Sequence, residues 1–285
     1  MKKIVLILIC IVAVTANIFS QNNKKTDWEK DGLKDKVKSI ETKKCKELDK
    51  RECYDTIESS KYDENGKIVE KVFLTYGGIG AIATFKDKYH YKYNDVGLVI
   101  ESYHYTYNYI DNKYEYVGKS IYKYDKKEKY TERYLADGSL SSTSITKYDN
   151  KGNVLEENFY NAENGNLYKK ETYEYDNKGN LITKCFFSYR DRKETYEYDN
   201  NRNLITECAY HFYSSGEEYL VYKNIYEYDN KGNVIKKSNY FSEKYAPIDY
   251  KKKYKYDSKG NWVERIEYGE TMSNQIYKRT IEYYE

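Results

Sequence analysis

The sequence predicts an all-β protein in which tandem antiparallel β-hairpins form a long curved sheet or a partial barrel. Three observations support this prediction. The motif Tyr-x-Tyr-Asp-x-x-Gly-Asn, complete or degenerate, occurs eight times, and its second tyrosine recurs at intervals of 23 to 31 residues. The chain contains 39 tyrosines among 285 residues, and aromatic side chains favour strands. Only one proline, Pro247, is present, so few positions lack the backbone N–H that a sheet requires.

Tyrosine is expected to supply the core of these hairpins. Leu, Ile, Val and Phe make up only about a fifth of the residues, close to the range in which a chain cannot bury enough apolar surface to fold. A tyrosine ring adds a large apolar area, and its hydroxyl can remain in water. The formal net charge is +3, with basic and acidic residues interspersed. A nucleic-acid-binding protein concentrates its basic residues on one face, so we expect no nucleic-acid partner.

Residues 1–20 have the layout of a secretory signal peptide. Lys2 and Lys3 precede an apolar run, which is followed by small residues suited to cleavage. The run is shorter than the roughly 20 apolar residues that a membrane-spanning helix needs. A lipoprotein alternative rests on Cys10, which lies inside the apolar run and does not follow a small residue. We therefore expect an exported protein, periplasmic, secreted or at the cell surface, with no membrane span after cleavage.

Each part of the repeated motif has a physical reason. Tyr-x-Tyr places two rings on one face of a strand, because strand side chains alternate. Asp-x-x-Gly indicates a tight turn in which the aspartate bonds the backbone and the glycine adopts a positive φ. Six of the eight copies retain this glycine. Glu128 and Arg202 replace it in the other two, and we expect those two turns to be looser.

The connections between hairpins favour an antiparallel meander over a parallel solenoid. Asp-Gly, Asn-Gly and Ser-Gly pairs end the second strands at residues 137–138, 164–165 and 215–216, which indicates short loops at the opposite end of each hairpin. Cys185 and Cys208 occupy equivalent positions in adjacent repeats. A meander separates them by about 9.6 Å, beyond the roughly 7 Å limit for a disulfide, whereas a solenoid places them about 4.8 Å apart. With the meander, both are small apolar fillers.

Residues 21–58 are expected to form an N-terminal cap and the first strands, ahead of a hairpin-repeat domain over residues 59–285. Residues 36–40 have the pattern of an opening strand. Cys45 and Cys53 flank a polar stretch that can turn back on itself, and an even number of cysteines in an exported chain favours disulfides. We therefore predict a Cys45–Cys53 disulfide in a hairpin that caps the array.

The tandem motif resembles the YD repeats of bacterial RHS proteins and the related animal teneurins. The resemblance covers about four-fifths of the chain and is clearest in the copies that begin at Tyr173, Tyr226 and Tyr254. In that family the hairpins coil into a large β-sheet shell, which implies hairpin repeats and a secreted or surface location here. This sequence shows neither the large scaffold nor the C-terminal toxin domain that RHS proteins commonly carry, so the resemblance does not imply toxin delivery. Eight hairpins are also too few for a closed shell of that size.

No catalytic or cofactor motif is recognisable in the sequence. The histidines His90, His104 and His211 have no catalytic or metal-binding spacing, although His90 and His104 flank one hairpin turn and could meet across it. The Asp-Asn-Lys-Gly-Asn turns lack the alternating acidic ligands of a calcium loop. We therefore expect no enzyme activity, no cofactor and no metal site.

Two columns of tyrosines form the candidate ligand-binding face. Aligned repeats place the two rings of the motif in parallel columns on one face of the sheet. The rings either pack on one another as the core, or form an exposed groove that stacks on sugar rings or on a partner surface. The candidate ligand-stacking residues are Tyr173, Tyr175, Tyr196, Tyr198, Tyr226, Tyr228, Tyr254 and Tyr256.

The sequence therefore predicts an exported non-catalytic repeat protein, a binding or structural module of the cell envelope whose partner is a glycan or an envelope protein. The alternative is a self-assembling or adhesive surface protein that pairs through open sheet edges. A third hypothesis is an enzyme with a dispersed site.

Overall fold

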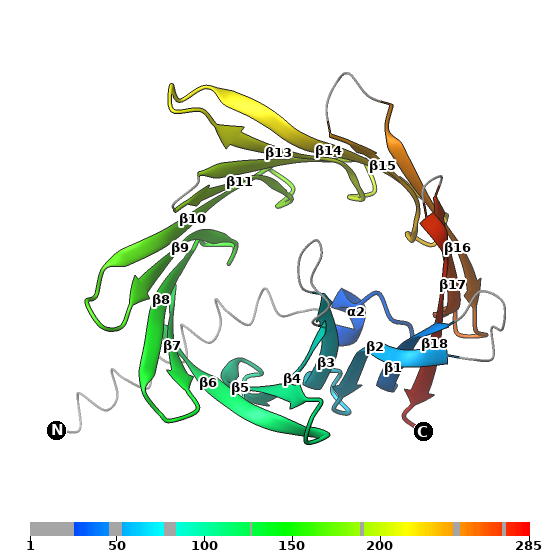
Figure 1. The fold of residues 1–285 in the computed structure, drawn as a ribbon, viewed down its shortest axis with the longest axis horizontal. Coiled ribbons are helices and arrows are strands. Elements are labelled where there is room, and N and C mark those ends of the chain that lie inside the picture. The colour runs from blue at the N-terminus through cyan, green and yellow to red at the C-terminus, as the bar shows by residue number, and fades with distance from the viewer. Residues whose placement is uncertain are drawn as a thin grey trace.

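The computed structural model describes residues 26–45, 53–76, 84–125, 127–188, 191–241, 246–269 and 272–285. The expected signal peptide over residues 1–20 lies outside these ranges. The described residues form one short helix and eighteen strands (Figure 1). They are α2 (Asp27–Lys30), β1 (Val37–Cys45), β2 (Cys53–Tyr62), β3 (Ile68–Tyr76), β4 (Thr84–Tyr93), β5 (Val99–Asn108), β6 (Lys113–Asp125), β7 (Glu128–Leu135), β8 (Leu140–Tyr148), β9 (Val154–Asn161), β10 (Leu167–Tyr175), β11 (Leu181–Phe187), β12 (Arg192–Tyr198), β13 (Leu204–Phe212), β14 (Glu218–Tyr228), β15 (Val234–Tyr240), β16 (Ile248–Tyr256), β17 (Trp262–Gly269) and β18 (Met272–Tyr283).

The strands form a closed antiparallel barrel. Each strand pairs with its neighbours in sequence, and β1 also pairs with β18, where Ile40 lies opposite Ile281 and Glu41 opposite Thr280. Figure 1 looks down this ring. The predicted all-β antiparallel meander is confirmed, whereas the predicted open curved sheet or partial barrel is wrong. The reason is that the N-terminal hairpin β1–β2 supplies a partner for the last strand, so eighteen strands close on themselves.

The hairpin expected to cap the array is therefore a member of the ring. Cys45 is disulfide-bonded, and Cys53 is its register partner across β1 and β2. The side chain of Cys53 lies outside the described part of the chain, so the Cys45–Cys53 pairing stays a prediction. Cys185 on β11 and Cys208 on β13 are free, and β12 separates them, as the meander requires.

All Asp-x-x-Gly turns lie at one end of the barrel, which we call the turn mouth; the opposite end is the loop mouth. In the β14–β15 turn the N–H of Asp229 donates to Asn233 O at 2.9 Å, and the N–H of Gly232 donates to Asp229 O at 3.1 Å. The carboxylate of Asp229 accepts from the N–H groups of Lys231 and Asn233. Gly232 has a φ of 82°, as the motif predicts. The order Asp-x-x-Gly-Asn is thus explained by bonds within the turn.

The two turns without glycine differ in how they replace the residue with positive φ. Arg202 adopts a φ of 68° and keeps the backbone hydrogen bonds of a glycine turn. Its guanidinium donates to Asn180 Oδ1 and to Lys178 O, each at 2.8 Å, so the expected loosening is not met there. Asp125 and Glu128 instead face each other as register partners, which shortens the other turn.

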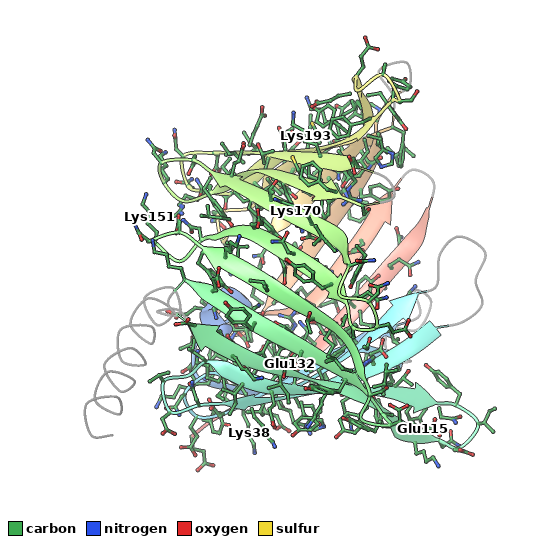
Figure 2. All side chains as sticks on the ribbon, turned by 90° about the vertical axis from the view of Figure 1, so that its left-hand side faces the viewer. Lys38, Glu115, Glu132, Lys151, Lys170 and Lys193 are labelled. Atoms are coloured by element: carbon green, nitrogen blue, oxygen red, sulfur yellow. The ribbon has the colours of Figure 1, made fainter. Side chains whose placement is uncertain are left out.

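Alternation along the strands separates a lumenal face from an outer face. The Tyr-x-Tyr rings face the lumen, because Tyr62 packs against Trp28 of α2 and α2 lies inside the ring (Figure 1). The residue between the two tyrosines points outward. Figure 2 shows that outer wall, with Glu132, Lys170 and Lys193 on it. Cross-strand pairs at 2.8 to 3.1 Å line it near the turn mouth: Lys61–Glu70, Lys92–Glu101, Lys123–Glu132, Lys147–Glu156 and Lys255–Glu264.

The helix α2 anchors the N-terminal segment inside the turn mouth. Thr26 caps it: the side chain of Thr26 accepts from the N–H of Glu29, and the carboxylate of Glu29 accepts from the N–H of Thr26 at 2.7 Å. The indole N–H of Trp28 donates to Val37 O at 2.5 Å. Trp28 belongs to an apolar cluster with Leu33, Val37, Ile40 and Tyr62. Within the described ranges, no helix has the length and apolar character needed to cross a membrane.

Candidate functional site

The lumenal face of the barrel is the candidate site. With about 4.8 Å between strands and a tilt of about 40°, eighteen strands enclose a ring about 36 Å across between opposite backbones. Barrels of this strand number are too wide for side chains to fill and leave an aqueous interior. Tyr62, which α2 covers, is only 3% exposed. All eight candidate tyrosines of β10, β12, β14 and β16 are half-buried.

The second tyrosine of the motif ties its hairpin to the preceding one. Tyr228 donates to Leu204 O at 2.8 Å, and Tyr256 donates to Asp229 Oδ2 at 2.6 Å. Burial and then the hydrogen bond to Asp229 raise the pKa of Tyr256 well above its ordinary value, so its hydroxyl remains a donor. Equivalent bonds to the preceding hairpin are made by Tyr93, Tyr124 and Tyr283. The hydroxyls of these tyrosines therefore have a structural role, and their rings remain on the lumenal face.

In three repeats the first tyrosine of the motif bonds a lumenal carboxylate. The pairs are Tyr173 with Glu171 at 2.5 Å, Tyr196 with Glu194 at 2.7 Å and Tyr226 with Glu207 at 2.7 Å. In the repeat on β16, Tyr254 donates to Val234 O instead. Burial raises the pKa of Glu171, but hydrogen bonds from Lys169, Tyr173 and Lys184 together lower it more strongly. The net pKa of Glu171 is about 2. Ionised carboxylates are thus held in fixed positions between half-buried rings.

The tyrosine columns are interrupted by the intervening strands of the meander. A strand separates the tyrosines of successive hairpins, and lysines from those strands lie over the rings. The ammonium of Lys184 is 5.1 Å from the ring centre of Tyr173, and that of Lys237 is 5.8 Å from the ring centre of Tyr226. Binding of a ligand by these rings stays a prediction, but the face is a mosaic of rings, carboxylates and ammonium groups rather than an aromatic stripe.

A cavity of about 270 Å³ lies beside one stacked pair of rings, and we call it the Tyr89–His104 cavity. The rings of Tyr89 and His104 are 4.5 Å apart and inclined by 4°. His104 Nε2 lies 3.0 Å from Asp87 Oδ1. His90 lies instead on the outer face, 3.3 Å from Glu70, so His90 and His104 do not meet. Other residues that line the cavity include Ser102, Gly118, Ser120 and Arg133.

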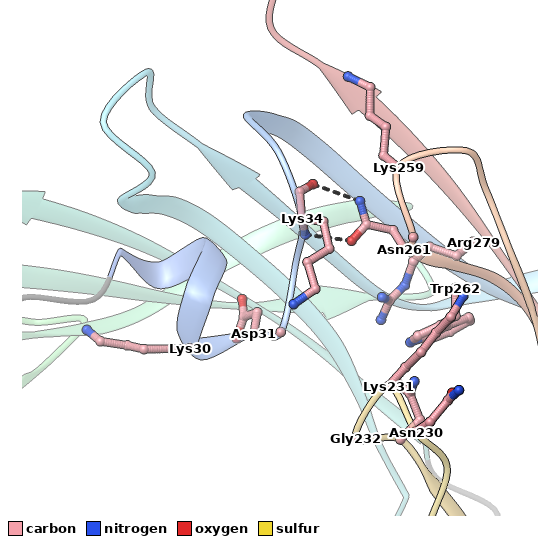
Figure 3. Close-up of a pocket in the computed structure, with 13 residues that line it drawn as sticks. Lys30, Asp31, Lys34, Asn230, Lys231, Gly232, Lys259, Asn261, Trp262 and Arg279 are labelled. Carbon is pink, nitrogen blue, oxygen red and sulfur yellow. Dashed lines mark hydrogen bonds between the residues drawn. The ribbon is translucent and has the colours of Figure 1, made fainter.

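A second cavity, of about 670 Å³, lies at the turn mouth between the N-terminal segment and two turns (Figure 3). Asn261 joins these parts: its Oδ1 accepts from the N–H of Lys34 at 2.7 Å, and its Nδ2 donates to Lys34 O at 2.8 Å. We call it the cationic cavity, because its lining includes Lys30, Lys34, Lys231, Lys259 and Arg279 but only one carboxylate, Asp31.

Between β5 and β16, the described part of the loop mouth carries exposed apolar side chains, which we call the apolar rim. Within it, Tyr213 and Tyr219 contact each other with ring centres 4.4 Å apart, beside a cavity of about 500 Å³ that His211 also lines. The rim comprises Tyr109, Ile110, Leu135, Leu140, Leu167, Tyr168, Phe187, Phe212, Tyr213, Tyr219 and Phe241, each between 36% and 91% exposed.

The sequence pattern placed the tyrosines on one face, but it indicated neither the Tyr89–His104 cavity, nor the cationic cavity, nor the rim. The cationic cavity exists only because ring closure brings Lys34 to the turn at Asn261, and no local pattern signals this contact. The rim could have been found from the apolar residues that end the second strands, such as Phe187 and Phe212. Among the described residues, no group of three or more His, Cys, Asp or Glu side chains is arranged to hold a metal ion.

Comparison with known proteins yields structural likenesses only. No protein-family model and no curated protein matches the chain. A porin-like protein from Bacteroides uniformis aligns over 86% of this chain and 96% of its own, with 10% identity and a TM-score of 0.48. A porin-like protein from Bacteroides vulgatus aligns over 86% of this chain and 98% of its own, with 13% identity and a TM-score of 0.29. A Tc holotoxin pore from Photorhabdus luminescens aligns over 78% of this chain and 15% of its own, with 12% identity and a TM-score of 0.31. No function is carried over from likenesses this low.

Proposed function

We propose that this chain is an exported, non-catalytic binding protein whose barrel takes a polar ligand, a glycan, into its lumen. The observation that carries the proposal is the lumenal mosaic of half-buried tyrosine rings and fixed ionised groups, as at Tyr173, Glu171 and Lys184. Ligand sites combine apolar or aromatic surface with a few polar groups in fixed positions, and sugar rings present both an apolar face and hydroxyls to such a surface.

Beside this mosaic, the Tyr89–His104 cavity is a further lumenal seat that fits one sugar unit. Its volume of about 270 Å³ is slightly below the roughly 300 to 1,000 Å³ of pockets for drug-sized ligands, as suits a single sugar unit. The Tyr89 and His104 rings offer a flat wall, and Ser120 and Arg133 offer donors to hydroxyl groups.

Export is part of the proposal and rests on the N-terminal sequence and on the disulfide-bonded Cys45. Disulfides persist in oxidising compartments outside the cytosol. The cross-strand Lys–Glu pairs of the outer wall favour a barrel surrounded by water, since a barrel wall in lipid presents an apolar band. The resemblance to YD repeats remains a proposal of the same kind.

The test is a glycan screen followed by matched tyrosine variants. Tyr173→Leu with Tyr196→Leu removes two lumenal rings, whereas Tyr160→Leu with Tyr210→Leu removes two half-buried rings from the outer face. We expect the lumenal double variant to weaken binding of the glycan found in the screen by about 1 to 3 kcal/mol, from two stacked rings, and the outer double variant to leave it unchanged. Melting temperatures of both variants control for folding. Absence of binding by the wild type to any glycan, or equal losses in the two variants, contradicts the proposal.

Self-association is a second candidate, now favoured by the apolar rim rather than by sheet edges. Each described strand has a partner on both sides, so the ring presents no free edge to another chain. The rim, with Ile110 91% exposed and Phe241 60% exposed, is instead the surface that a second copy could cover. Sedimentation velocity at rising concentration tests this: a monomer at all concentrations refutes it, and a dimer that Ile110→Ser with Phe241→Ser abolishes supports it.

A further inference from the structure

We propose that the cationic cavity at the turn mouth is a separate binding site for a ligand that carries two or more oxyanion groups, such as phosphates, sulfates or carboxylates (Figure 3). The site lies between the N-terminal segment and the β14–β15 and β16–β17 turns. It does not include the tyrosines of the candidate ligand-stacking face, except where Tyr256 supports one of its lysines. The inference therefore does not depend on the glycan proposal.

The cavity has more positive charge than its surroundings neutralise. Lys30 pairs with Asp27 at 3.0 Å, and Lys259 pairs with Asp35. These two lysines thus have acidic partners, neither of which lines the cavity. Three cations remain, Lys34, Lys231 and Arg279, against the single lining carboxylate of Asp31.

That carboxylate is already engaged. Asp31 Oδ2 accepts a hydrogen bond from the hydroxyl of Tyr62 at 2.5 Å. Tyr62 is almost fully buried, so this bond fixes the carboxylate at the inner wall of the cavity. No ion pair within 4 Å joins Asp31 to Lys34, Lys231 or Arg279 among the described contacts. An excess of positive charge therefore faces the cavity.

Arg279 is the cation of the cavity that a bound anion would stabilise most. Its guanidinium lies 3.6 Å from the ring centre of Trp262, and its Nε is buried without a hydrogen-bond partner. Arg265 approaches the same ring at 5.0 Å and adds a second positive charge. Burial lowers the pKa of Arg279 to about 10 and the nearby charge of Glu58 acts in the opposite direction, so the group is still charged at neutral pH. A buried N–H without an acceptor is unfavourable, and an oxyanion that enters the cavity supplies both an acceptor and the opposite charge.

Lys34 and Lys231 are held at the cavity by contacts other than ion pairs with carboxylates. The backbone of Lys34 is fixed on both sides by Asn261. The ammonium of Lys231 lies 3.6 Å from the ring centre of Tyr256. Both side chains are exposed, and Figure 3 shows them with Arg279 around the cavity. The backbone of Lys34 and the ammonium of Lys231 are thus already in place, and binding has to order mainly the side chain of Lys34.

The size of the cavity and the spread of its charges indicate the class of ligand. A volume of about 670 Å³ is within the roughly 300 to 1,000 Å³ of ligand pockets and exceeds what one small ion fills. The unneutralised cations come from the N-terminal segment, from the β14–β15 turn and from β18. A ligand with several oxyanion groups can contact all three, and a neutral ligand gains nothing from them.

Isothermal titration calorimetry at low salt tests the site with inorganic pyrophosphate and trigalacturonate, and with maltotriose as the neutral probe. We expect at least one anionic probe to bind, more weakly as salt is added, and maltotriose not to compete for the same site. The double variant Lys34→Gln with Lys231→Gln should weaken the anion by about fivefold to tenfold, since exposed ion pairs are individually weak. Binding of pyrophosphate but not trigalacturonate indicates phosphate chemistry, and the reverse indicates a uronate.

Matched controls exist at the same mouth. Lys151 and Lys178 occupy the position of Lys231 in two other Asp-x-Lys-Gly-Asn turns and do not line the cavity. The variant Lys151→Gln with Lys178→Gln has the same charge change and should bind the anion as the wild type does. Two results overturn the proposal: neither anionic probe binds the wild type, or the control variant loses as much affinity as the cavity variant.

Discussion

Substitution of Gly66 by alanine tests whether α2 is docked inside the turn mouth. Gly66 and Gly232 occupy the same position of the motif, with φ values of 77° and 82°. A Cβ on Gly66 would lie 2.6 Å from Trp28 Cε3 and 2.9 Å from Thr26 Cβ, whereas a Cβ on Gly232 has no neighbour within 4 Å. The two substitutions therefore share the backbone effect and differ only in what the new methyl group meets.

The magnitudes follow from these contacts. A non-glycine residue in the left-handed region costs about 1 kcal/mol, which is the whole effect expected for Gly232→Ala. Gly66→Ala adds a clash with the ring of Trp28, which is 9% exposed and has little room to move. Overpacking of this kind costs about 1 to 3 kcal/mol, so the total for Gly66→Ala is about 2 to 4 kcal/mol.

Urea unfolding of the two variants measures the difference in the free energy of unfolding. Tryptophan fluorescence gives a second readout, because Trp28 is one of only two tryptophans and should become more exposed in Gly66→Ala alone. Equal losses of stability in the two variants, with unchanged emission, would refute the docking of α2 against this turn.

Two further predictions use the same logic. Asn261→Ala removes hydrogen bonds to the backbone of Lys34 and to the hydroxyl of Tyr283, so it should lower the free energy of unfolding by about 2 to 4 kcal/mol. The control Asn153→Ala removes a side chain that bonds within its own turn and should cost about 1 kcal/mol. Urea midpoints of the two variants check this prediction, and equal midpoints contradict it. Glu171 has a pKa of about 2 in the folded protein, against an ordinary value of 4.5. Its ionised form therefore contributes up to about 3 kcal/mol to the free energy of unfolding. This contribution is fully present above pH 4.5 and is lost as the pH falls toward 2. Glu171→Gln should flatten the acid limb of stability against pH, measured by urea unfolding at each pH, and an unchanged slope excludes this contribution.

The hairpins were predictable from the sequence because turn chemistry is local. The bonds of Asp229 to Lys231 and Asn233 need nothing outside the turn, and the glycine position needs only its own φ. Ring closure was not predictable, because it depends on a register between the first and last strands, in which Ile40 faces Ile281. Neither residue carries a local signal for that pairing.

The candidate site was predictable in its residue types and not in its arrangement. The alternation of the motif placed Tyr173 and Tyr175 on one face, but only the closed ring makes that face a lumen. The register also decides which residue of β5 meets Tyr89, and that residue is His104. His90 follows Tyr89 on β4 and faces the other side because strand side chains alternate. A shift of one residue in register would exchange the two faces, and the sequence of one hairpin does not determine it.

Cysteine cross-linking across the closing seam tests the barrel most directly. Glu41 and Thr280 are register partners on the outer faces of β1 and β18, and Lys255 and Glu264 are such partners within one hairpin. Under mild oxidation, Glu41→Cys with Thr280→Cys should form an intramolecular disulfide in the monomer as readily as Lys255→Cys with Glu264→Cys, with the linked peptides identified by mass spectrometry. Efficient linkage of the hairpin control without any linkage between positions 41 and 280 would contradict the closed barrel and, with it, the lumen.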